Sequence, residues 1–580
     1  MNILGISDVT GNHSHSSVAI LQDGLLTFAL SQERISRVKN DSQFPREAIQ
    51  KALDFTGLRL EDIDWFACGY PPANYYGSLM ARSKMDLIRS IRGLLIRRPN
   101  ALLRYLVPNI RKGIFDPKNS NGLLDLGVPK EKFMFVDHHL AHVVAGYLSS
   151  DFEECLAISY GGFAPHSDGK NVAGAVYRCQ GDRIEHLEDI PMFATGCFYS
   201  GISVALGFKY MQQEGKTMGL AANGNPKTCY DALARLATRF RDGDWQPYPF
   251  WVDYIMSPRK TAFLGTKSGA RLRRLLDRYL PQDIASAAQL IWEENLLAFI
   301  AYLVKKYPHK KLVLSGGTFL NVRINSAIAM MTEIETIHCH PHVGDGSTTV
   351  GAAIEAHRST TGITPRQKVI DVGLGVEFTE AAVENELRRL SSAIAFTKIS
   401  EPVARYGARQ IAAGKIIGWF QGREEYGQRS LGHRCILADP RKKEMADRIT
   451  GAIKGRESFI PVSPSCLMEF GSHYFVDFNA TPFMNRIYRV QKNQEKNIPG
   501  ALHADKTARI HSVDKDGYPP FRELIENFNQ LSGVPMVLNT SLNRHGDPIA
   551  HRPSDAIKVL LDSNLDELVI GPFSVRKITD

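Results

Sequence analysis

Short apolar runs separated by polar turns dominate the start of the chain. Residues 2–7 and 18–29 have the pattern of paired strands, and the Gln-Asp-Gly triplet at residues 22–24 predicts a hairpin turn within the second run. Residues 131–137 predict a further strand, which leads into a helix that begins near His138.

Two continuous apolar runs, at residues 155–159 and 311–315, predict buried strands, and a pair of glycines after each run predicts a turn. Residues 284–307 predict one long amphipathic helix. Strands that end in glycine turns, with helices between them, predict an α/β architecture.

The length of the chain predicts more than one domain. With 580 residues and a 43% hydrophobic fraction, the chain is too long for a single ordinary core. The polar segment 357–367 contains Gly and Pro and is the preferred boundary. It divides the chain into a first domain over residues 1–360 and a second α/β domain over residues 370–580.

The composition limits the classes of ligand and site that suit this chain, but it does not identify one ligand. A net charge of +9 and a pI near 9.0 suit anionic ligands such as nucleotides, acyl phosphates, nucleic acids or acidic glycans. The eight cysteines include no CxxC pair, which argues against a structural zinc site or a disulfide framework and favours the reducing cytoplasm. No uninterrupted apolar run is long enough to predict a membrane-spanning helix.

One segment, residues 82–112, is rich in arginine and lysine with leucines interleaved. Pro99 predicts that it forms two helices rather than one. The segment is either a solvated amphipathic insertion or a patch that binds an anionic acceptor or a membrane surface.

The string Asp137-His138-His139-Leu140-Ala141-His142 has the spacing of a metal-binding helix. His138 and His142 lie four residues apart, so they share one helix face and both imidazoles can reach one ion. Asp345, between two glycines, is the best candidate for a third ligand. The alternative is a polar helix face without a metal.

Three further motifs suit anionic and planar ligands. Gly316 and Gly317 follow a predicted strand, where backbone N–H groups can approach a phosphate, although a plain tight turn has the same pattern. Arg423, Lys454 and Arg456 are natural partners of an acyl phosphate. Asn539 and Ser541 offer both the donors and the acceptors that a planar amide needs. Individually, each of these residues is also compatible with an ordinary surface ion pair or turn.

Taken together, the ordered motifs resemble the NodU/CmcH-type carbamoyltransferase family over nearly the whole chain. The matching strings are Glu33-Arg34, Lys39 through Phe44-Pro45, Asp137 through His142, Glu214 through Ala221, Gly316-Gly317, Gly344-Asp345-Gly346, Gln421-Gly422-Arg423, Asn539-Thr540-Ser541 and Pro553 through Ala556.

The resemblance implies an N-terminal actin-like ATPase domain of the ASKHA class, related to threonylcarbamoyl-transferring enzymes, and a YrdC-like C-terminal domain. It implies that the C-terminal domain forms carbamoyl-adenylate from carbamoyl phosphate and ATP, with Mg2+. It implies that an iron site, Fe2+ or another divalent metal, in the N-terminal domain then transfers the carbamoyl group to a hydroxyl.

The resemblance also implies residue roles. Catalytic roles fall on His13, His15 and Lys39. Metal ligands fall on His138, His142 and Asp345, with Tyr160 as a further candidate. Nucleotide contacts fall on Gly161, Gly162, Gly316, Gly317 and Asn321. Carbamoyl-phosphate contacts fall on Arg423, Lys454, Arg456, Arg509, Asn539 and Ser541. Acceptor contacts fall on Glu214 and Lys216.

The chain departs from the family pattern at two positions. Relatives usually carry a His-Asp pair whose His is the general base, but strict spacing places Ser14 there, so His13 or His15 is the expected base. Relatives often carry a ligating Asp where this chain has Tyr160. Either the Tyr160 phenolate or water then completes the metal site.

Three functions compete: a carbamoyltransferase, a tRNA-modifying carbamoyl enzyme, and a non-enzymatic sensor of carbamoyl phosphate or nucleotide. The tRNA enzymes normally divide the two domains between chains, which favours the first function. We expect a saccharide acceptor, anionic or lipid-linked, with peripheral membrane association and no nucleic acid. The oligomeric state is left open.

Overall fold

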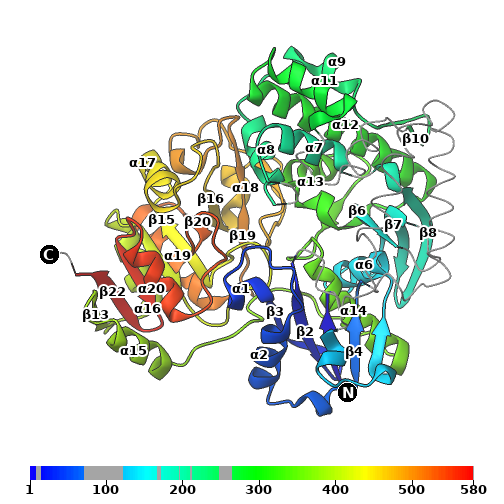
Figure 1. Ribbon diagram of the computed structural model, residues 1–580. Helices are drawn as coiled ribbons and strands as arrows, with labels where there is room; N and C mark the ends of the chain where they lie inside the picture. Colours follow the sequence, from blue (N-terminus) through cyan, green and yellow to red (C-terminus); the bar gives the residue numbers. More distant parts are fainter. Residues whose placement is uncertain are drawn as a thin grey trace.

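The structure, a computed structural model, describes residues 1–7, 15–70, 122–165, 171–194, 196–209, 212–246 and 264–578. His13 and the basic segment 82–112 lie outside these residues, so the roles expected for them stay predictions. Figure 1 shows two parts side by side, an N-terminal part in blue to green and a C-terminal part in yellow to red. We name the two parts by the predicted division at residues 360–370.

The first sheet of the N-terminal part begins with the predicted hairpin. Its strands are β1 (Asn2–Ile6), β2 (Ser17–Gln22), β3 (Leu25–Ser31), β4 (Trp65–Cys68) and β5 (Phe133–Phe135). Their order is β3-β2-β1-β4-β5, with β1, β2 and β3 antiparallel and β1, β4 and β5 parallel. Helices α1 (Gln32–Ser36) and α2 (Arg46–Thr56) follow β3, and α5 (Gly122–Asp125) precedes β5.

The second sheet repeats this arrangement. Its strands are β6 (Glu154–Pro165), β7 (Asn171–Gln180), β8 (Arg183–Pro191), β11 (Lys311–Ser315) and β12 (Thr336–His338). The order β8-β7-β6-β11-β12 has the same succession of antiparallel and parallel neighbours as the first sheet. The N-terminal part is therefore built around two copies of one five-stranded arrangement.

Two helices, α6 (His138–Leu148) and α14 (Gly346–Thr361), pack against each other between the two sheets (Figure 1). A Cβ at Gly351 would lie 1.8 Å from the carbonyl oxygen of Ala141, so only glycine permits this close crossing. The crossing brings the N-terminal turn of α14 beside the histidines of α6.

Gly161 and Gly162 lie inside a strand rather than in the turn that the sequence predicts. Strand β6 continues to Pro165, and its register against β7 shifts between Tyr160 and Ala164. The turn prediction is wrong here because the strand absorbs the two glycines in an irregular stretch, where residues without side chains are tolerated.

A helical region covers the second sheet. It contains α7 (Cys197–Ala205), α8 (Glu214–Ala221), α9 (Tyr230–Ala234), α11 (Lys267–Leu276), α12 (Pro281–Lys306) and α13 (Val322–Ala329), with the short strands β9 (Arg239–Arg241) and β10 (Asp244–Gln246). Contrary to the sequence expectation, α12 is long and apolar enough to cross a membrane by length and composition. However, 61% of its most apolar window is buried within the protein, as expected for a core helix.

The C-terminal part is built on one mixed, eight-stranded sheet of order β13-β22-β21-β14-β15-β20-β16-β19. These strands are β13 (Ile394–Lys398), β14 (Ile417–Phe420), β15 (Arg434–Ala438), β16 (Ser463–Leu467), β19 (His511–Val513), β20 (Met536–Ser541), β21 (Glu567–Ile570) and β22 (Phe573–Lys577). Strands β17 (Ile487–Arg489) and β18 (Thr507–Arg509) form a separate pair.

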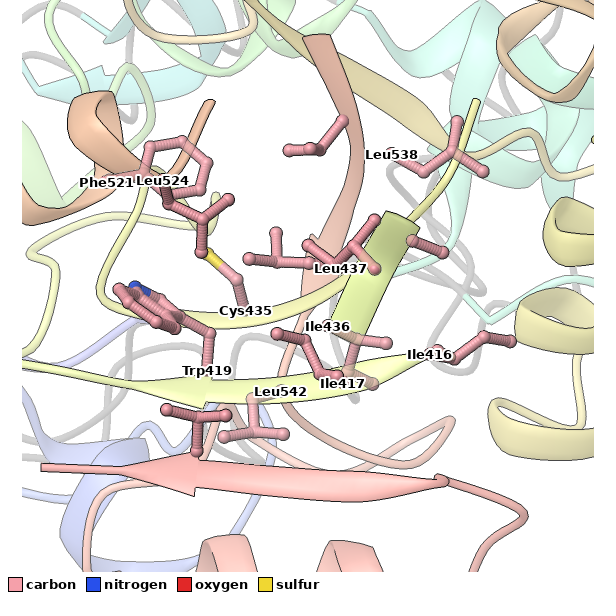
Figure 2. Close-up of a cluster of buried hydrophobic side chains, with 14 of the residues drawn as sticks. Ile416, Ile417, Trp419, Cys435, Ile436, Leu437, Phe521, Leu524, Leu538 and Leu542 are labelled. Carbon is pink, nitrogen blue, oxygen red and sulfur yellow. The ribbon is translucent and has the colours of Figure 1, made fainter. Parts of the chain in front are cut away.

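Helices cover this sheet and complete its core. They are α15 (Glu380–Arg389), α16 (Val403–Ala412), α17 (Lys443–Arg448), α18 (Gly471–Tyr474), α19 (Pro519–Ser532) and α20 (Pro553–Leu561). Figure 2 shows Trp419 and Cys435 from the central strands packed beside Phe521 and Leu524 of α19. With its mixed sheets and covering helices, the molecule is an α/β protein, as the sequence predicts.

Candidate active site

One large cavity, of about 1550 Å³, lies between the two parts and is lined by both. Its N-terminal wall carries the histidines of α6, the glycines within β6 and Gly317, which follows β11. Its C-terminal wall carries a loop at residues 427–429 and a second segment at residues 456–462. Several of the residues predicted from motifs far apart in the chain therefore face one shared space, whereas Tyr160, Gly316, Arg423, Lys454, Asn539 and Ser541 are not among the described residues that line it.

The structure brings His138, His142 and Asp345 together, with one potential ligand atom from each lying within 4.8 Å of the others. Asp137 accepts a hydrogen bond from the backbone N–H of Leu140 and thereby caps α6, so that both histidines fall on its first turns. The Nε2 atoms of His138 and His142 lie 4.0 and 3.6 Å from Oδ1 of Asp345.

The opposite ring nitrogens are occupied, which orients both imidazoles. His138 Nδ1 lies 3.1 Å from the carbonyl oxygen of Gly69, and His142 Nδ1 lies 2.8 Å from Ser347 Oγ. Each Nε2 is thus directed toward Asp345, the orientation that hydrogen bonds to the far ring nitrogen give to metal-binding histidines. Two imidazoles and one carboxylate fit a divalent metal such as Fe2+.

Tyr160 is not a plausible fourth ligand in this geometry, and we correct that expectation. Its hydroxyl donates to the carbonyl oxygen of Ala194, and its ring packs against Trp245 and Trp292. Successive residues of a strand face opposite sides, so Ser159 points toward His139 while Tyr160 enters the core. Complete burial also raises the pKa of the Tyr160 hydroxyl, which opposes a phenolate.

The two glycine segments meet because β6 and β11 are parallel neighbours, with Ser159 opposite Ser315. A Cβ at Gly316, whose φ is +95°, would lie 2.6 Å from the carbonyl oxygen of Tyr160. Gly162 and Gly317 have open space around them, and Gly161, Gly162, Gly317 and Asn321 line the cavity. This surface of exposed backbone can accept a phosphate or a nucleotide.

His15, Glu33 and Lys39 line the cavity near the histidine group. The ring of His15 lies 6.1 Å from that of His342, and burial lowers the pKa of His15. Although burial raises the pKa of Glu33, the nearby Lys39 and Arg34 charges and the N–H of Asn40 bring it down to about 2. Lys39 pairs with this carboxylate at 3.0 Å.

Three arginines, Arg429, Arg456 and Arg509, line the opposite wall, and no ion pair joins any of them to the part of the chain that the structure describes. Burial, together with the charges of Arg429 and Arg456, lowers the pKa of Arg509. Burial lowers the pKa of Arg456 to about 10. Partly buried arginines that face a cavity and form no ion pair within the described residues are an anion-binding arrangement.

Arg429 lines the cavity and is absent from the residues that the sequence assigned to the site. It lies on a loop whose backbone is fixed by the Glu425 carboxylate, which accepts from the N–H groups of Leu431, His433 and Arg434 at 3.1, 2.9 and 2.9 Å. The glycines at 427 and 432 have φ of +135° and +122°. In the sequence, the two glycines on either side of Arg429 were the available signal of a loop that presents this arginine.

Lys454 and Ser541 lie together beside this cluster. Lys454 Nζ donates to Ser541 and to both the backbone and side-chain oxygens of Asn543, the latter at 2.7 and 2.6 Å. Burial, followed by the charges of Arg456 and Lys39, lowers the pKa of Lys454. Asn539 donates to the Ser430 carbonyl at 3.0 Å, so it supports the backbone next to Arg429.

Glu214 and Lys216 of α8 also line the cavity. Lys216 forms an ion pair with Glu457 of the C-terminal part at 2.6 Å. The pair stands beside Arg456 and bridges the two walls, so the structure joins Lys216 to the anion-binding side. The acceptor role predicted for Glu214 and Lys216 stays a prediction.

Arg423 does not lie where its expected role requires, and we correct that assignment. Its guanidinium donates to the carbonyl oxygens of Gly375 and Thr27 at 2.9 and 2.8 Å and also to Leu374, and it stacks 4.6 Å from the Phe55 ring. Arg423 is not among the described residues that line the cavity. It joins the two parts of the chain.

We therefore expect Arg423→Ala to lower the melting temperature without changing the affinity for carbamoyl phosphate. The variant leaves the partly buried carbonyl oxygens of Gly375 and Thr27 without this donor, at a cost of about 1–3 kcal/mol. Thermal unfolding and titration calorimetry measure the two effects, with the exposed Arg405→Ala as the control. If Arg423→Ala lost affinity for carbamoyl phosphate at an unchanged melting temperature, Arg423 would be a ligand-binding residue after all.

A cavity that joins a two-histidine, one-carboxylate group to unpaired arginines suits an enzyme that handles an anionic group donor. Comparison with known proteins identifies the family. Residues 2–354 match the family model described as Carbamoyltransferase N-terminus, and residues 408–577 match Carbamoyltransferase C-terminus. The chain belongs to the carbamoyltransferase family, which confirms the resemblance seen in the sequence.

Named relatives span most of the chain. It is 28% identical over 578 residues to Nodulation protein NolNO of Sinorhizobium fredii, covering 99% of this chain and 80% of that protein. It is 32% identical over 448 residues to Nodulation protein NolO of Bradyrhizobium diazoefficiens, covering 76% and 79%. It is 30% identical over 301 residues to 3'-hydroxymethylcephem-O-carbamoyltransferase of Streptomyces clavuligerus, covering 51% and 55%.

Among solved structures, HypF of T. kodakarensis matches with a TM-score of 0.31 and 15% identity, covering 63% of this chain and 49% of that one. This overlap is too small to define a shared fold. The family assignment rests on the sequence matches, and these make the chain a carbamoyltransferase with O-carbamoyltransferases among its relatives.

Proposed function

We propose that this carbamoyltransferase forms carbamoyl-adenylate from carbamoyl phosphate and ATP and then carbamoylates a hydroxyl of a sugar-containing acceptor. The observation that carries the proposal is the single cavity, which connects the unpaired arginines of the C-terminal part to the His138, His142 and Asp345 group of the N-terminal part.

The chemistry balances in three steps. Water cleaves carbamoyl phosphate to carbamate and inorganic phosphate. A carbamate oxygen then attacks the α-phosphorus of ATP, so pyrophosphate leaves and carbamoyl-adenylate remains. Finally, the acceptor oxygen attacks the carbamoyl carbon, AMP leaves, and a base takes the hydroxyl proton. Because carbamoyl-adenylate hydrolyses easily, a shared closed cavity protects it between the second and third steps.

The residues divide between these steps by position. Arg429, Arg456 and Arg509 neutralise the phosphates of carbamoyl phosphate and ATP, with Lys454 and Ser541 beside them. ATP brings Mg2+ with its phosphates. The nucleotide binds on the opposite wall along Gly161, Gly162, Gly317 and Asn321, which line the cavity, while Gly316 shapes the backbone behind them through its close approach to Tyr160.

His138, His142 and Asp345 would hold Fe2+ or another divalent ion, which supplies Lewis-acid polarisation of a carbonyl or phosphoryl oxygen. His15 is the described residue best placed to take the proton of the acceptor, since burial keeps its imidazole neutral and it faces the same cavity. Glu33 and Lys39 border this end.

The fold supports the same proposal. Two five-stranded sheets of identical order are the arrangement expected of a doubled, actin-like ATPase domain, and the eight-stranded sheet would be the YrdC-like domain. All eight cysteines are buried thiols, consistent with a cytoplasmic protein. An anionic or lipid-linked saccharide remains the proposed acceptor, resting on the basic segment 82–112.

The test uses the purified full chain with carbamoyl phosphate and ATP. We expect pyrophosphate release that depends on carbamoyl phosphate, with one inorganic phosphate for each pyrophosphate, and labelled carbamoyl groups transferred to components of a glycan extract. Tight binding of carbamoyl phosphate and ATP without pyrophosphate release would instead indicate a sensor.

A further inference from the structure

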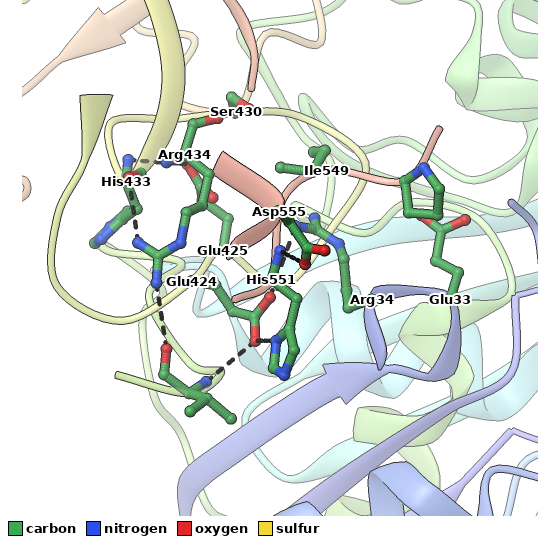
Figure 3. A network of polar contacts seen from close by, with 12 residues as sticks. Glu33, Arg34, Glu424, Glu425, Ser430, His433, Arg434, Ile549, His551 and Asp555 are labelled. Atoms are coloured by element: carbon green, nitrogen blue, oxygen red, sulfur yellow. Dashed lines mark hydrogen bonds and ion pairs between the residues drawn. The ribbon is translucent and has the colours of Figure 1, made fainter. Parts of the chain in front are cut away.

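The short helix α1 and the residue after it, Arg37, belong to the N-terminal part but insert into the C-terminal part. This segment contains the Glu33-Arg34 motif, and only Glu33 of that motif faces the cavity. Arg34 is only 2% exposed and reaches toward Glu424, with its Nη1 at 3.9 Å from Oε2 (Figure 3). The Arg34 side chain therefore lies in the interface between the two parts and not in the cavity.

Arg34 contacts the loop that carries Arg429. Its Nη2 donates to the carbonyl oxygen of Gly427 at 2.9 Å, two residues before Arg429. The rest of this loop is held from within the C-terminal part by Glu425 and Asn539. The N-terminal part therefore supplies the contact that fixes Gly427, the first residue of the loop that carries Arg429.

Arg37 contacts a second loop of the C-terminal part, residues 547–549. Its Nη1 and Nη2 donate to the carbonyl oxygens of Ile549 and Pro548 at 2.7 and 2.8 Å. This loop is tied to the anion site through Asn543, which donates to the carbonyl oxygen of Asp547 and accepts from Lys454 Nζ.

The backbone conformation at Arg37 disfavours a long side chain. Arg37 has φ of 60° and ψ of 18°, a left-handed conformation at the end of α1 that favours glycine. A long cationic side chain at such a position carries a conformational cost. Two backbone carbonyls bound by one guanidinium fork offset that cost.

We propose that Arg34 and Arg37 are positioning residues, through which the N-terminal part sets the loop that carries Arg429 and the 547–549 loop that is linked to Lys454. They act through Arg429 and Lys454 and do not face the cavity themselves. The inference rests on the proposed function, since it assigns those loops to carbamoyl phosphate. If Arg34 and Arg37 act in this way, the adenylate-forming site is complete only when α1 is docked against the C-terminal part.

The test compares Arg37→Gly and Arg37→Lys with wild type in the full chain. Glycine suits the left-handed backbone, so Arg37→Gly removes the fork without adding strain. Lysine retains the positive charge, but its ammonium group cannot reproduce the two parallel hydrogen bonds that the guanidinium donates to the carbonyl oxygens. Arg46→Gln, at an exposed arginine that begins α2, is the matched control.

Calorimetry with carbamoyl phosphate alone and pyrophosphate-release kinetics provide separate readouts. We expect Arg37→Gly to weaken carbamoyl-phosphate binding and raise its KM by about tenfold or more, with a smaller rise in Arg37→Lys, while the metal content stays at the wild-type value. The melting temperature should fall in Arg37→Gly, because the carbonyl oxygens of Ile549 and Pro548 lose their donor and Asp555 loses its ion pair, so both affinities are measured well below it. Wild-type affinity in both variants would overturn the inference. If Arg37→Gly does not fold, the Arg37→Lys affinity decides. Binding by wild type without pyrophosphate release would reject the proposed function instead.

Discussion

Replacing His142 by alanine is expected to abolish carbamoyl transfer while leaving pyrophosphate release close to the wild-type rate. His142 Nε2 lies 3.6 Å from Asp345, in the group that fits a metal, whereas the arginines that hold the phosphates lie on the opposite wall of the cavity. Loss of a contact outside the ligand set alone typically costs 10- to 100-fold in metal affinity, and loss of a ligand costs more. Elemental analysis should show about one ion per wild-type chain and well below a tenth of that in the variant.

Ser347→Ala is a milder test of the same site, because Ser347 Oγ contacts His142 at its far ring nitrogen, at 2.8 Å, and also donates to the carbonyl oxygen of Gly344 at 3.0 Å. It should weaken metal binding by about 10- to 100-fold and reduce transfer without abolishing it. His186→Ala, at an exposed histidine of β8, is the control for loss of an imidazole elsewhere. If His142→Ala folds normally but loses both activities together, the two ends of the cavity do not divide the reaction as proposed.

Local sequence patterns predicted the elements whose determinants are themselves local. The hairpin at residues 22–24 follows from turn chemistry, and β2 and β3 do pair around it. The four-residue spacing of His138 and His142 places both on one face of α6, and the structure adds Asp345 as anticipated. These inferences needed only the periods of a helix and a strand.

The roles predicted for Arg423 and Tyr160 were wrong because the positions of these side chains depend on distant partners. Arg423 occupies a Gly-Arg-Glu string that suits an anion ligand, but a carbonyl acceptor 396 positions away, at Thr27, decides where its guanidinium goes. Tyr160 stands where a ligand was expected, yet strand alternation turns it into the core. No pattern within either motif distinguishes these outcomes.

Replacing Arg429 by alanine is expected to weaken carbamoyl-phosphate binding by about 10- to 100-fold, the value of one charge-assisted contact of about 1.5–3 kcal/mol. The same variant should melt at a higher temperature than wild type when no ligand is present. Burial lowers the pKa of Arg429, its charge lowers the pKa of Arg509, and no ion pair joins it to the described residues. Removing it therefore relieves repulsion without breaking an ion pair.

Arg509→Ala provides the contrast, because Arg509 Nε also donates to Ser463 Oγ at 2.8 Å. Its affinity loss should be similar, but its gain in melting temperature should be smaller, since the variant also loses that hydrogen bond. Thermal unfolding with and without carbamoyl phosphate measures both effects, and the ligand-induced rise in melting temperature should shrink in each variant. A wild-type response to carbamoyl phosphate in Arg429→Ala would remove this arginine from the binding site. A lower melting temperature in the ligand-free variant would mean that Arg429 is held by favourable contacts, because a site that keeps unpaired charges for a ligand is destabilised by them until the ligand arrives.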